Sequence, residues 1–534
     1  MSEKIEDTIR TCLSQYRRHN VNAAWFVIGR YSHEKPDALA LHVVTSEERE
    51  RSYTFGELDV LSAKLSAGLA GLGVEPGDRV AALLPKGLEL TLTALATWRL
   101  GAVYVPLFTA FGNEAVSYRL NDSETKVVVT DANNRGKLVA SAANSLRVIV
   151  TVNDASRDDM TFDGLLTSSP RTEWTTRNDD DPMILLYTSG TTGQPKGVVV
   201  PVWALAAFET YMRLGLDVNL TDQFWNLADP GWAYGLYYGL IGPLLLGQAT
   251  FVYQGAFDPQ NIVGVLKRYH ITNFAAAPTA FRAIRAASIP PQKTSLRVIS
   301  SAGEPLNPEI SQWSEKVFNR PIYDHYGQTE LGMVINNHHD LRLDHSVQPG
   351  SMGIAMPGFR VVIVDDEGVE LNSEQKGHLA IDTESSPLFW FTGYYKAAER
   401  TQERFTKDGR YYLTGDDAWH DDAGYFYFIG RSDDIILSAG YRIGPFEVEN
   451  ILMAHPSVAE CAVIGIPDEL RGELVKAHIV LRNGYRASRQ LESELQEWVR
   501  QRLAKTAYPR EMVFVDVLPK TPSGKIQRYR LRNE

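Results

Sequence analysis

The sequence predicts an α/β protein with a large N-terminal body and a small, mobile α+β domain at its C-terminus. Through the first 330 residues, short apolar runs typical of buried strands alternate with stretches of helical periodicity. This alternation indicates mostly parallel sheets covered by helices. After residue 430 the pattern changes to a compact unit of about a hundred residues. Because 534 residues exceed what one core usually supports, we expect two domains, 1–432 and 433–534.

The elements of the body follow from local patterns. Thr54-Phe-Gly-Glu57 is a capping box, and leucines at helical spacing follow it as far as Gly73, so a helix is predicted between them. Predicted strands are 79–85, 126–130, 147–152, 183–188, 249–254, 271–278 and 297–301. Short strand-like pieces separated by glycines in 350–430 predict a small antiparallel or β-barrel-like subdomain.

The C-terminal unit has its own set of elements. The spacing of apolar residues predicts helices over 447–455 and 491–503. Strands are expected at 458–464, 475–481 and 512–515. The last 35 residues also carry nine basic and three acidic side chains, which is consistent with contact to a phosphorylated ligand.

Composition favours a reducing, cytoplasmic setting. Cys12 and Cys461 lie too far apart in sequence to suggest a disulfide framework or a metal site, and the first residues are too acidic for a signal peptide. The net charge of −11 argues against nucleic-acid binding. Residues 231–253 are apolar and long enough to span a bilayer, but recurring glycines and Pro243 favour a buried helix plus strand instead.

The most informative motif is Tyr187-Thr-Ser-Gly-Thr-Thr-Gly-Gln-Pro-Lys-Gly197, which follows an apolar strand. Backbone N–H groups in a glycine-rich loop can converge on phosphate oxygens. A Gly-Lys-Ser/Thr ending is absent, so the loop of kinases and GTPases does not fit. The candidate phosphate ligands are Thr188, Ser189, Gly190, Thr191, Thr192, Gly193 and Lys196.

Five further motifs follow in order. They contain glycines, aromatic groups, carboxylates and cations at the ends of predicted strands, where α/β ligand sites lie. They are Ser301-Ala-Gly-Glu-Pro305, Tyr323-Asp-His-Tyr-Gly-Gln-Thr-Glu330, Tyr411-Tyr-Leu-Thr-Gly-Asp-Asp417, Gly430-Arg-Ser-Asp-Asp434 with the following segment to Gly444, and Pro519-Lys-Thr-Pro-Ser-Gly-Lys-Ile-Gln-Arg528.

In this order and spacing, the motifs closely resemble the superfamily of acyl-CoA synthetases, peptide-synthetase adenylation domains and beetle luciferases. The resemblance runs from about residue 35 to 532, and the C-terminal motifs look like those of medium-chain and acetyl-type acyl-CoA synthetases. It implies an AMP-forming reaction in which a carboxylic acid attacks the α-phosphate of ATP, releases pyrophosphate and is then transferred from the acyl-adenylate to CoA.

The resemblance assigns roles to the reacting groups. Lys525 matches the catalytic lysine, which is expected to bridge the acid and the α-phosphate, and Thr329 is expected to bond the same phosphate. Glu330 would ligate Mg²⁺, while residues 188–196 would hold the β- and γ-phosphates. Because charge develops on the α-phosphoryl oxygens, positioned cations should dominate catalysis.

The resemblance also assigns the nucleoside contacts. Asp416 should accept both ribose hydroxyls, and Arg431 should donate to the ribose. Tyr326 is expected to stack on adenine. The remaining residues expected at the nucleotide are Gly303, Glu304, Pro305, Asp324, His325, Gly327 and Gln328.

The small domain is expected to rotate about Asp433 between an adenylating and a thioester-forming pose. Lys525 would then leave the cleft, and Arg442 would face the substrate phosphate. The resemblance places the expected CoA contacts at Ala439, Gly440, Tyr441, Arg471, Tyr508, Pro509 and Arg510.

The acid is the least determined substrate. The acetate-specific branch has a tryptophan at the position of Gly327, so an acid longer or bulkier than acetate is predicted. Asp229 and Trp232 resemble another wall of the acyl pocket, and Tyr234, Tyr237 and Tyr238 could shorten it. Short-to-medium, branched and aryl acids stay open.

Three alternatives stay open at this point. An amino-acid or other carboxylate adenylating enzyme would use Asp229 for the ammonium group, although no carrier domain follows. A luciferase-like oxygenase would share only the first half-reaction. A non-catalytic nucleotide-binding protein predicts erosion at Lys525, Glu330 or Asp416, and all three residues are present. Acetylation of Lys525 and control through subunit assembly are regulatory hypotheses.

Overall fold

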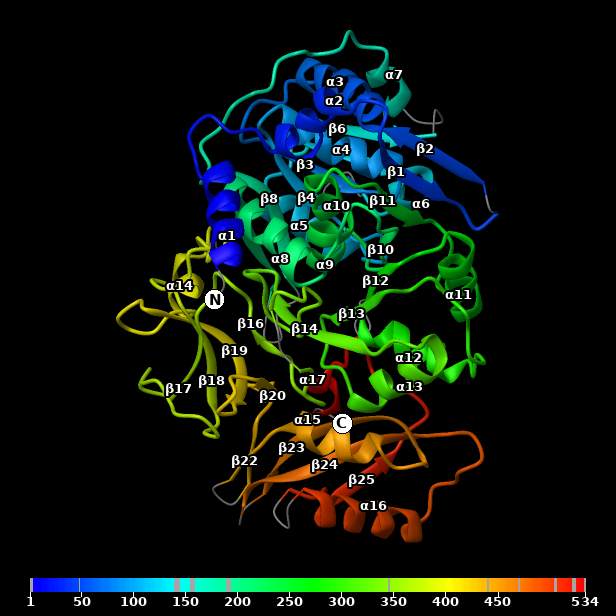
Figure 1. Ribbon diagram of the computed structural model, residues 1–534, viewed down its shortest axis with the longest axis vertical. Coiled ribbons are helices and arrows are strands. Elements are labelled where there is room, and N and C mark those ends of the chain that lie inside the picture. Colours follow the sequence, from blue (N-terminus) through cyan, green and yellow to red (C-terminus); the bar gives the residue numbers. More distant parts are fainter. Residues whose placement is uncertain are drawn as a thin grey trace.

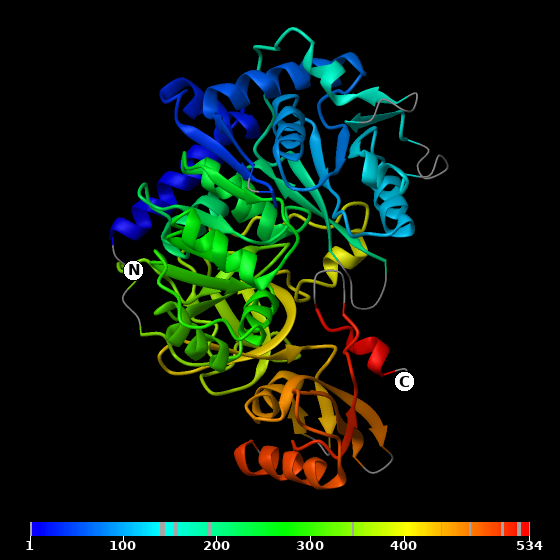
Figure 2. The same ribbon diagram turned by 90° about the vertical axis from the view of Figure 1, so that its right-hand side faces the viewer.

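A computed structural model describes residues 3–47, 49–138, 145–153, 159–188, 194–343, 346–438, 441–468, 471–503, 507–520 and 525–532, without the side chains of 441 and 442. Figure 1 shows a large body above a smaller C-terminal domain, and Figure 2 shows the same division from the side. The predicted α/β body with a small α+β domain is confirmed.

The first sheet of the body has the strand order β7-β6-β5-β3-β4-β8-β9. All neighbours are parallel except β8 and β9, which form an antiparallel pair. Its strands are β3 (Arg79–Leu83), β4 (Val103–Pro106), β5 (Val127–Asp131), β6 (Val148–Val152), β7 (Met160–Thr161), β8 (Pro182–Thr188) and β9 (Lys196–Pro201). Helix α3 (Phe55–Gly71) precedes these strands, and the helices between them are α4 (Leu88–Arg99), α5 (Asn113–Asp122), α6 (Ala132–Arg135) and α7 (Phe162–Leu166).

Helix α3 confirms the predicted capping box. The Thr54 hydroxyl accepts a hydrogen bond from the Glu57 N–H at 3.2 Å, and the Glu57 carboxylate accepts one from the Thr54 N–H at 2.8 Å. Gly73 follows the helix with φ +83°, a conformation that glycine adopts without steric cost.

The second sheet has the order β10-β12-β13-β14-β15-β16, parallel from β10 to β14 and antiparallel beyond. Its strands are β10 (Phe224–Asn226), β12 (Asn273–Ala276), β13 (Val298–Ala302), β14 (Ile322–Gln328), β15 (Gly332–Asn336) and β16 (Ile354–Ala355). Helices α11 (Pro259–Arg268), α12 (Pro278–Ala286) and α13 (Pro308–Phe318) connect its parallel strands.

A three-stranded sheet, β11-β1-β2, and several helices complete the upper body. These elements are α1 (Glu3–Tyr16), η1 (Trp25–Gly29), α2 (Arg30–Glu34), β1 (Leu39–Val44), β2 (Glu50–Thr54), η2 (Val202–Ala204), α8 (Leu205–Leu214), α9 (Ala233–Gly235), η3 (Leu236–Ile241), α10 (Gly242–Leu245) and β11 (Thr250–Tyr253). The apolar run 231–253 is therefore a buried helical segment plus a strand, as predicted. No helix in the described ranges is long and apolar enough to cross a membrane.

The subdomain predicted in 350–430 is a four-stranded antiparallel sheet, which is the first of the two forms expected. Its order is β17-β18-β19-β20. The elements are β17 (Val361–Val364), β18 (Gly377–Asp382), α14 (Ala398–Gln402), β19 (Tyr411–His420) and β20 (Phe426–Arg431).

The C-terminal domain has its own apolar core. Its sheet runs β22-β21-β24-β23, and β25 also pairs with β24. The elements are β21 (Ile436–Ser438), β22 (Tyr441–Ile443), α15 (Pro445–Met453), β23 (Val458–Asp468), β24 (Gly472–Leu481), α16 (Arg489–Arg502), β25 (Glu511–Phe514) and α17 (Arg528–Leu531). All five elements predicted here are present.

Polar side-chain contacts join the body to α15 of the small domain. The Lys376 ammonium lies 2.7 Å from the Glu447 carboxylate, and Asn307 donates a hydrogen bond to Asn450. Both contacts are made by α15. In Figure 1 α17 lies at the level where the small domain meets the body, and Figure 2 shows it at the side of that junction. β22 lies at the lower left of the small domain in Figure 1.

Candidate active site

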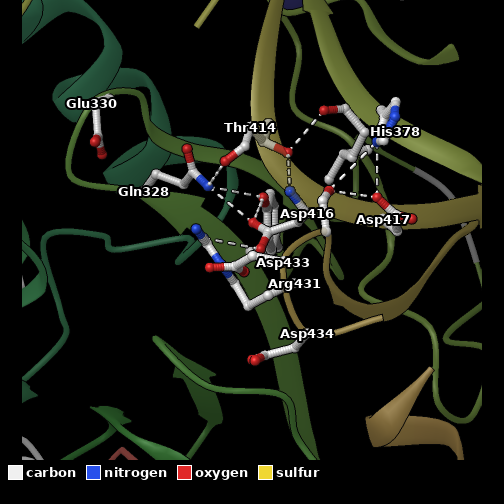
Figure 3. Close-up of polar contacts among 12 residues, drawn as sticks. Gln328, Glu330, His378, Thr414, Asp416, Asp417, Arg431, Asp433 and Asp434 are labelled. Carbon is white, nitrogen blue, oxygen red and sulfur yellow. Dashed lines mark hydrogen bonds and ion pairs between the residues drawn. The ribbon is translucent and has the colours of Figure 1, made fainter. Parts of the chain in front are cut away.

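Asp416, on β19, is the centre of the best-defined polar cluster. It is 4 % exposed and accepts hydrogen bonds from the Tyr326 hydroxyl, from Gln328 Nε2 at 2.9 Å and from Arg431 Nη1 at 3.2 Å. Gln328 Nε2 also donates to the Thr414 carbonyl at 2.8 Å. Figure 3 shows Gln328 and Arg431 directed at this carboxylate. Four predicted nucleotide-binding residues therefore meet at one buried anion.

The neighbouring carboxylate, Asp417, serves another cluster. It accepts hydrogen bonds from the Ser432 hydroxyl and lies 2.9 Å from His378 Nδ1. The hydrogen bond to Asp417 raises the pKa of His378. Successive strand residues point to opposite faces, so the two adjacent aspartates have separate surroundings, as Figure 3 shows.

Glu330 follows β14 and is 6 % exposed. Its Oε1 accepts a hydrogen bond from the Tyr394 hydroxyl at 2.7 Å, and Tyr394 accepts one from Arg404 Nε at 3.0 Å. The Lys196 ammonium lies 4.9 Å from the centre of the Tyr394 ring. Burial lowers the pKa of Lys196, and the nearby Arg404 and Arg400 lower it further. Several cations therefore gather beside one buried carboxylate.

The predicted phosphate loop joins two paired strands. Thr188 ends β8 and lies opposite Lys196, which begins β9. The residues between them that were predicted to bind phosphate, Ser189, Gly190, Thr191, Thr192 and Gly193, lie outside the described residues. The register of the pair nevertheless fixes where the loop leaves and re-enters the sheet.

On the adenine side, Asp324 has a buried Oδ1 for which the described residues offer no hydrogen-bond partner. Burial raises the pKa of this carboxyl to about 8, although the backbone N–H groups of Leu306 and His325 oppose the shift. Gly303 has φ +96° and open space where a side chain would stand. This corner thus keeps an acceptor and space for a planar donor such as the adenine amino group.

Other predicted nucleotide residues direct their side chains elsewhere. His325 bonds Tyr211 at 2.6 Å and the Asn337 carbonyl at 2.9 Å, so both ring nitrogens are engaged in the core. Glu304 accepts from Thr279 at 2.6 Å and from Arg282. The side chains of both residues are therefore already bonded within the body. The Thr329 carbonyl accepts a hydrogen bond from the Tyr237 hydroxyl at 3.2 Å. Pro305 directly follows Glu304 in the chain.

The raised pKa of Asp324 leads to a pH prediction. Between the ordinary value near 4 and about 8, the folded protein keeps a proton that the unfolded chain has lost, so the contribution of Asp324 to stability falls as pH rises through this window. We expect Asp324→Asn to remove this dependence, which is at most about 1.4 kcal/mol per pH unit. Urea unfolding at pH 5.5, 6.5 and 7.5 gives the free energy of unfolding of the wild type and of Asp324→Asn. The same dependence of this free energy on pH in both proteins would contradict the assignment.

Of the predicted acyl-pocket residues, Gly327 lies on β14, and Tyr237 and Tyr238 contact the hairpin of β14 and β15. A Cβ at Gly327 would lie 2.1 Å from the Gly332 carbonyl oxygen and 2.7 Å from Met333 Cα, so this backbone admits no side chain there. Tyr238 accepts from the Met333 N–H at 3.1 Å, and Tyr234 is packed against Tyr238 with ring centres 5.8 Å apart. The tyrosines therefore occupy part of the space behind Gly327.

The other predicted wall of the acyl pocket combines the carboxylate of Asp229 with aromatic rings around Trp232. Burial raises the pKa of Asp229, while the Gly231 N–H, at 2.7 Å, and the Lys86 ammonium oppose this shift. Trp232 lies between Phe108 and Phe111, with ring centres 5.6 and 5.5 Å away.

The predicted C-terminal residues are spread over the small domain. Lys525 is exposed and lies just before α17. Asp433 lies in the crossing between β20 and β21, 3.6 Å from Arg431 Nε. Tyr441 and Arg442 lie on β22 opposite Ser438 and Leu437.

The predicted CoA contacts are only partly visible. Arg510 lies over the Tyr508 ring at 4.7 Å, next to Pro509, and the Arg471 N–H donates to Asp468 at 2.8 Å. Ala439 and Gly440 lie outside the described residues. The contacts described for Arg510 and Arg471 stay within the small domain and do not reach the Asp416 cluster.

The sequence analysis did not predict three residues near Glu330 and Lys196: the bonded pair Tyr394 and Arg404, and the exposed Arg400. They lie in a segment of charged and polar residues that carries no motif, and Tyr394 reaches Glu330 across 64 positions of the chain. Only the tertiary contact reveals them.

The residues present fit ATP and Mg²⁺. The unpartnered Asp324 Oδ1 suits the adenine amino group, the Asp416 carboxylate suits a diol, and Lys196 with the neighbouring arginines suits phosphates. Glu330 would offer Mg²⁺ a carboxylate oxygen, since such hard cations prefer oxygen ligands.

Comparisons with known proteins point the same way. A family model described as AMP-binding enzyme matches residues 30–395, and one described as AMP-binding enzyme C-terminal domain matches residues 447–525. An acetyl-coenzyme A synthetase of Bacillus subtilis is 38% identical over 528 residues, covering 95% of this chain and 89% of that protein.

Solved structures agree over nearly the whole chain. The crystal structure of a Brucella canis acyl-CoA synthetase has a TM-score of 0.77 and 43% identity, covering 99% of this chain and 98% of that one. An anthranilate CoA ligase in complex with anthranoyl-AMP has a TM-score of 0.86 and 27% identity, covering 97% of each chain.

Proposed function

The chain belongs to the AMP-binding enzyme family and is an ATP-dependent, AMP-forming acyl-CoA ligase, and we propose that its acid is larger than acetate. The similar proteins are named for acids as different as acetate and anthranilate, so likeness alone does not choose the acid. Gly327 carries the proposal, because the backbone of β15 leaves no room for a side chain at this position, where the acetate-specific branch has a tryptophan.

The nucleotide half of the site supports the first half-reaction. Asp416 would accept the ribose hydroxyls and Arg431 would donate to the same sugar, while Asp324 would accept from adenine. Tyr326 has its hydroxyl fixed by Asp416, so its ring is held in one orientation. We assign Lys196 and residues 188–193 to the β- and γ-phosphates.

The acid oxygen would attack the α-phosphorus, and pyrophosphate would leave from the opposite side. Lys525 and Thr329 would stabilise the negative charge that develops on the α-phosphoryl oxygens. Mg²⁺, when bound at Glu330, supplies charge neutralisation for the phosphates. CoA thiolate would then attack the acyl carbon, and AMP would leave.

The two half-reactions require different poses, and we propose that Asp433 is the hinge between domains 1–432 and 433–534. The place of α17 beside the junction of the two domains, with β22 at the outer edge of the small domain, is consistent with an adenylating pose (Figures 1 and 2). Rotation toward thioester formation would break the contacts Lys376–Glu447 and Asn307–Asn450. It would bring Tyr441, Arg442 and the remaining proposed CoA contacts to the cleft.

Lys525 is also the proposed site of regulation by acetylation, which would neutralise the charge used in adenylation. Its exposure is compatible with access by a modifying enzyme. Both cysteines are buried and free of disulfides, which is compatible with the proposed cytoplasmic setting. Mass spectrometry of the purified protein before and after a deacetylase would test the modification.

The acid proposal predicts an ordered response to chain length. Each methylene buried in the pocket contributes about 0.8 kcal/mol, or about fourfold in kcat/KM, so an acid with three additional carbons should exceed acetate by roughly 50-fold. AMP release with CoA, measured over acids of two to ten carbons including branched and aryl members, tests this. Acetate as the best substrate would contradict the proposal.

Tyr234 gives the matched pair of variants. Tyr234→Ala should shift the optimum toward bulkier acids because it removes a ring behind Gly327. Tyr234→Phe should keep the wild-type optimum, since it retains the ring that packs against Tyr238. An unchanged optimum in Tyr234→Ala would remove Tyr234 from the pocket.

A further inference from the structure

We propose that Arg404 is a positioning residue of this ligase: acting through Tyr394, it holds the Glu330 carboxylate at the polyphosphate half of the site. The inference rests on the proposed nucleotide site and adds to it a residue from the loop that follows α14. It concerns formation of the acyl-adenylate and not the transfer to CoA.

The hydrogen bonds form a directed chain. Arg404 Nε donates to the Tyr394 hydroxyl at 3.0 Å, and that hydroxyl donates to Glu330 Oε1 at 2.7 Å. The hydroxyl has one proton, so the arginine fixes which way it points. The bond from Tyr394 occupies Oε1, so among the described residues Glu330 Oε2 stays available to a cation or a phosphate-bound group.

A second contact fixes Arg404 itself. Its Nη1 donates to the Thr414 carbonyl at 3.3 Å. The same carbonyl accepts from Gln328, whose amide also bonds Asp416. Arg404 therefore links the carboxylate of the polyphosphate half to the strand that carries the ribose carboxylate.

The close approach depends on Gly415. This glycine has φ +75°, and a Cβ there would lie 2.7 Å from Arg404 Nη1 and 3.5 Å from Arg431 Nη2. A side chain at 415 would thus push the guanidinium away from Thr414. The planar fork of arginine can make both bonds at once, whereas a lysine ammonium is a single point of charge.

The charges around Arg404 indicate what the site is built to hold. Arg404 and Arg400 lower the pKa of Lys196, so the three cations repel one another in the absence of ligand. A polyphosphate relieves such repulsion when it binds. Because Arg404 keeps its hydrogen bonds to Tyr394 and Thr414, its charge stays beside Glu330 while Lys196 is the group left for phosphate.

The test separates the two half-reactions. Arg404→Gln loses a charged hydrogen bond, so we expect the KM for ATP to rise about 10- to 100-fold and the rate of ATP–pyrophosphate exchange to fall similarly. Thioester formation from chemically prepared acyl-adenylate and CoA should change less than threefold. Lys407→Gln removes an exposed charge from the same segment and should match the wild type in both assays.

Two variants test whether Arg404 acts by positioning Glu330 and not only by its charge. Arg404→Lys keeps the positive charge but loses the planar guanidinium, and Tyr394→Phe removes the bridging hydroxyl. Both should raise the KM for ATP, and the double variant Tyr394→Phe with Arg404→Gln should be no worse than Arg404→Gln alone, because the residues act in one chain. Magnesium pyrophosphate binding by calorimetry should weaken in parallel.

Three outcomes would overturn the proposal: full activity of Arg404→Lys, additive losses in the double variant, or equal losses in both half-reactions with a lowered melting temperature. A wild-type protein that forms no acyl-adenylate would instead refute the proposed function, so the two failures are distinguishable.

Discussion

Replacing Lys525 with alanine should reduce acyl-adenylate formation on the order of a hundredfold or more. The reason is electrostatic: the transition state spreads negative charge over the α-phosphoryl oxygens, and removing one positioned stabilising group typically costs this much. ATP binding should change little, because the other phosphate contacts stay in place. ATP–pyrophosphate exchange with saturating acid measures the step.

Two comparisons make the result specific to Lys525. Thioester formation from supplied acyl-adenylate should survive the substitution, since the lysine is proposed to leave the cleft for that step. Lys520→Ala provides a matched control, because Lys520 is a nearby lysine whose ammonium lies 2.8 Å from Glu460 on the small domain. Loss of both half-reactions, or full-speed adenylation by Lys525→Ala, would refute the division of labour.

Asp416→Asn should lower kcat/KM for ATP on the order of a hundredfold. The substitution keeps the shape but removes the charge and one of two acceptor oxygens, so a diol loses a charged hydrogen bond worth roughly 1.5–3 kcal/mol. It also leaves the Arg431 guanidinium without its carboxylate partner at 3.2 Å and loosens Tyr326 and Gln328. Steady-state kinetics with varied ATP and saturating acid measures the effect.

Asp417→Asn is the control for that experiment. The two aspartates are adjacent, but Asp417 bonds His378 and Ser432 on the opposite face of β19. We expect a lower melting temperature for Asp417→Asn with the KM for ATP within about threefold of wild type. A control that lost ATP binding as severely as Asp416→Asn would mean that the strand, and not the carboxylate, sets affinity.

Much of the fold could be predicted where short-range patterns determine it. The capping box at Thr54 and Glu57 involves four consecutive residues, and the confirmed strands at 127–131 and 148–152 contain four and five consecutive β-branched residues. The strands β4 and β9 were not predicted. β4 has only four residues, and β9 directly follows the phosphate loop, so their pairing with β3 and β8 is what makes them strands.

The residues of the candidate site also fall into those that the sequence predicts and those that only the fold reveals. Asp416, Glu330 and Lys196 stand in motifs and could be found by resemblance, whereas Arg404 could not, because its partners Tyr394 and Thr414 are brought to it by the fold. The expectation that His325 and Glu304 face the nucleotide was less exact, because a motif marks a stretch of chain but not which way each side chain turns. Side-chain direction depends on packing that a single sequence does not reveal.

The central claim is that this chain joins its acid to AMP before CoA reacts. The most direct measurement uses acid labelled with ¹⁸O in its carboxylate, ATP, Mg²⁺ and CoA, with mass spectrometry of the released AMP. If the acid oxygen attacks the α-phosphorus and stays there when thiolate displaces AMP, one label per turnover appears in AMP. Unlabelled AMP, or label in inorganic phosphate together with ADP, would contradict the account.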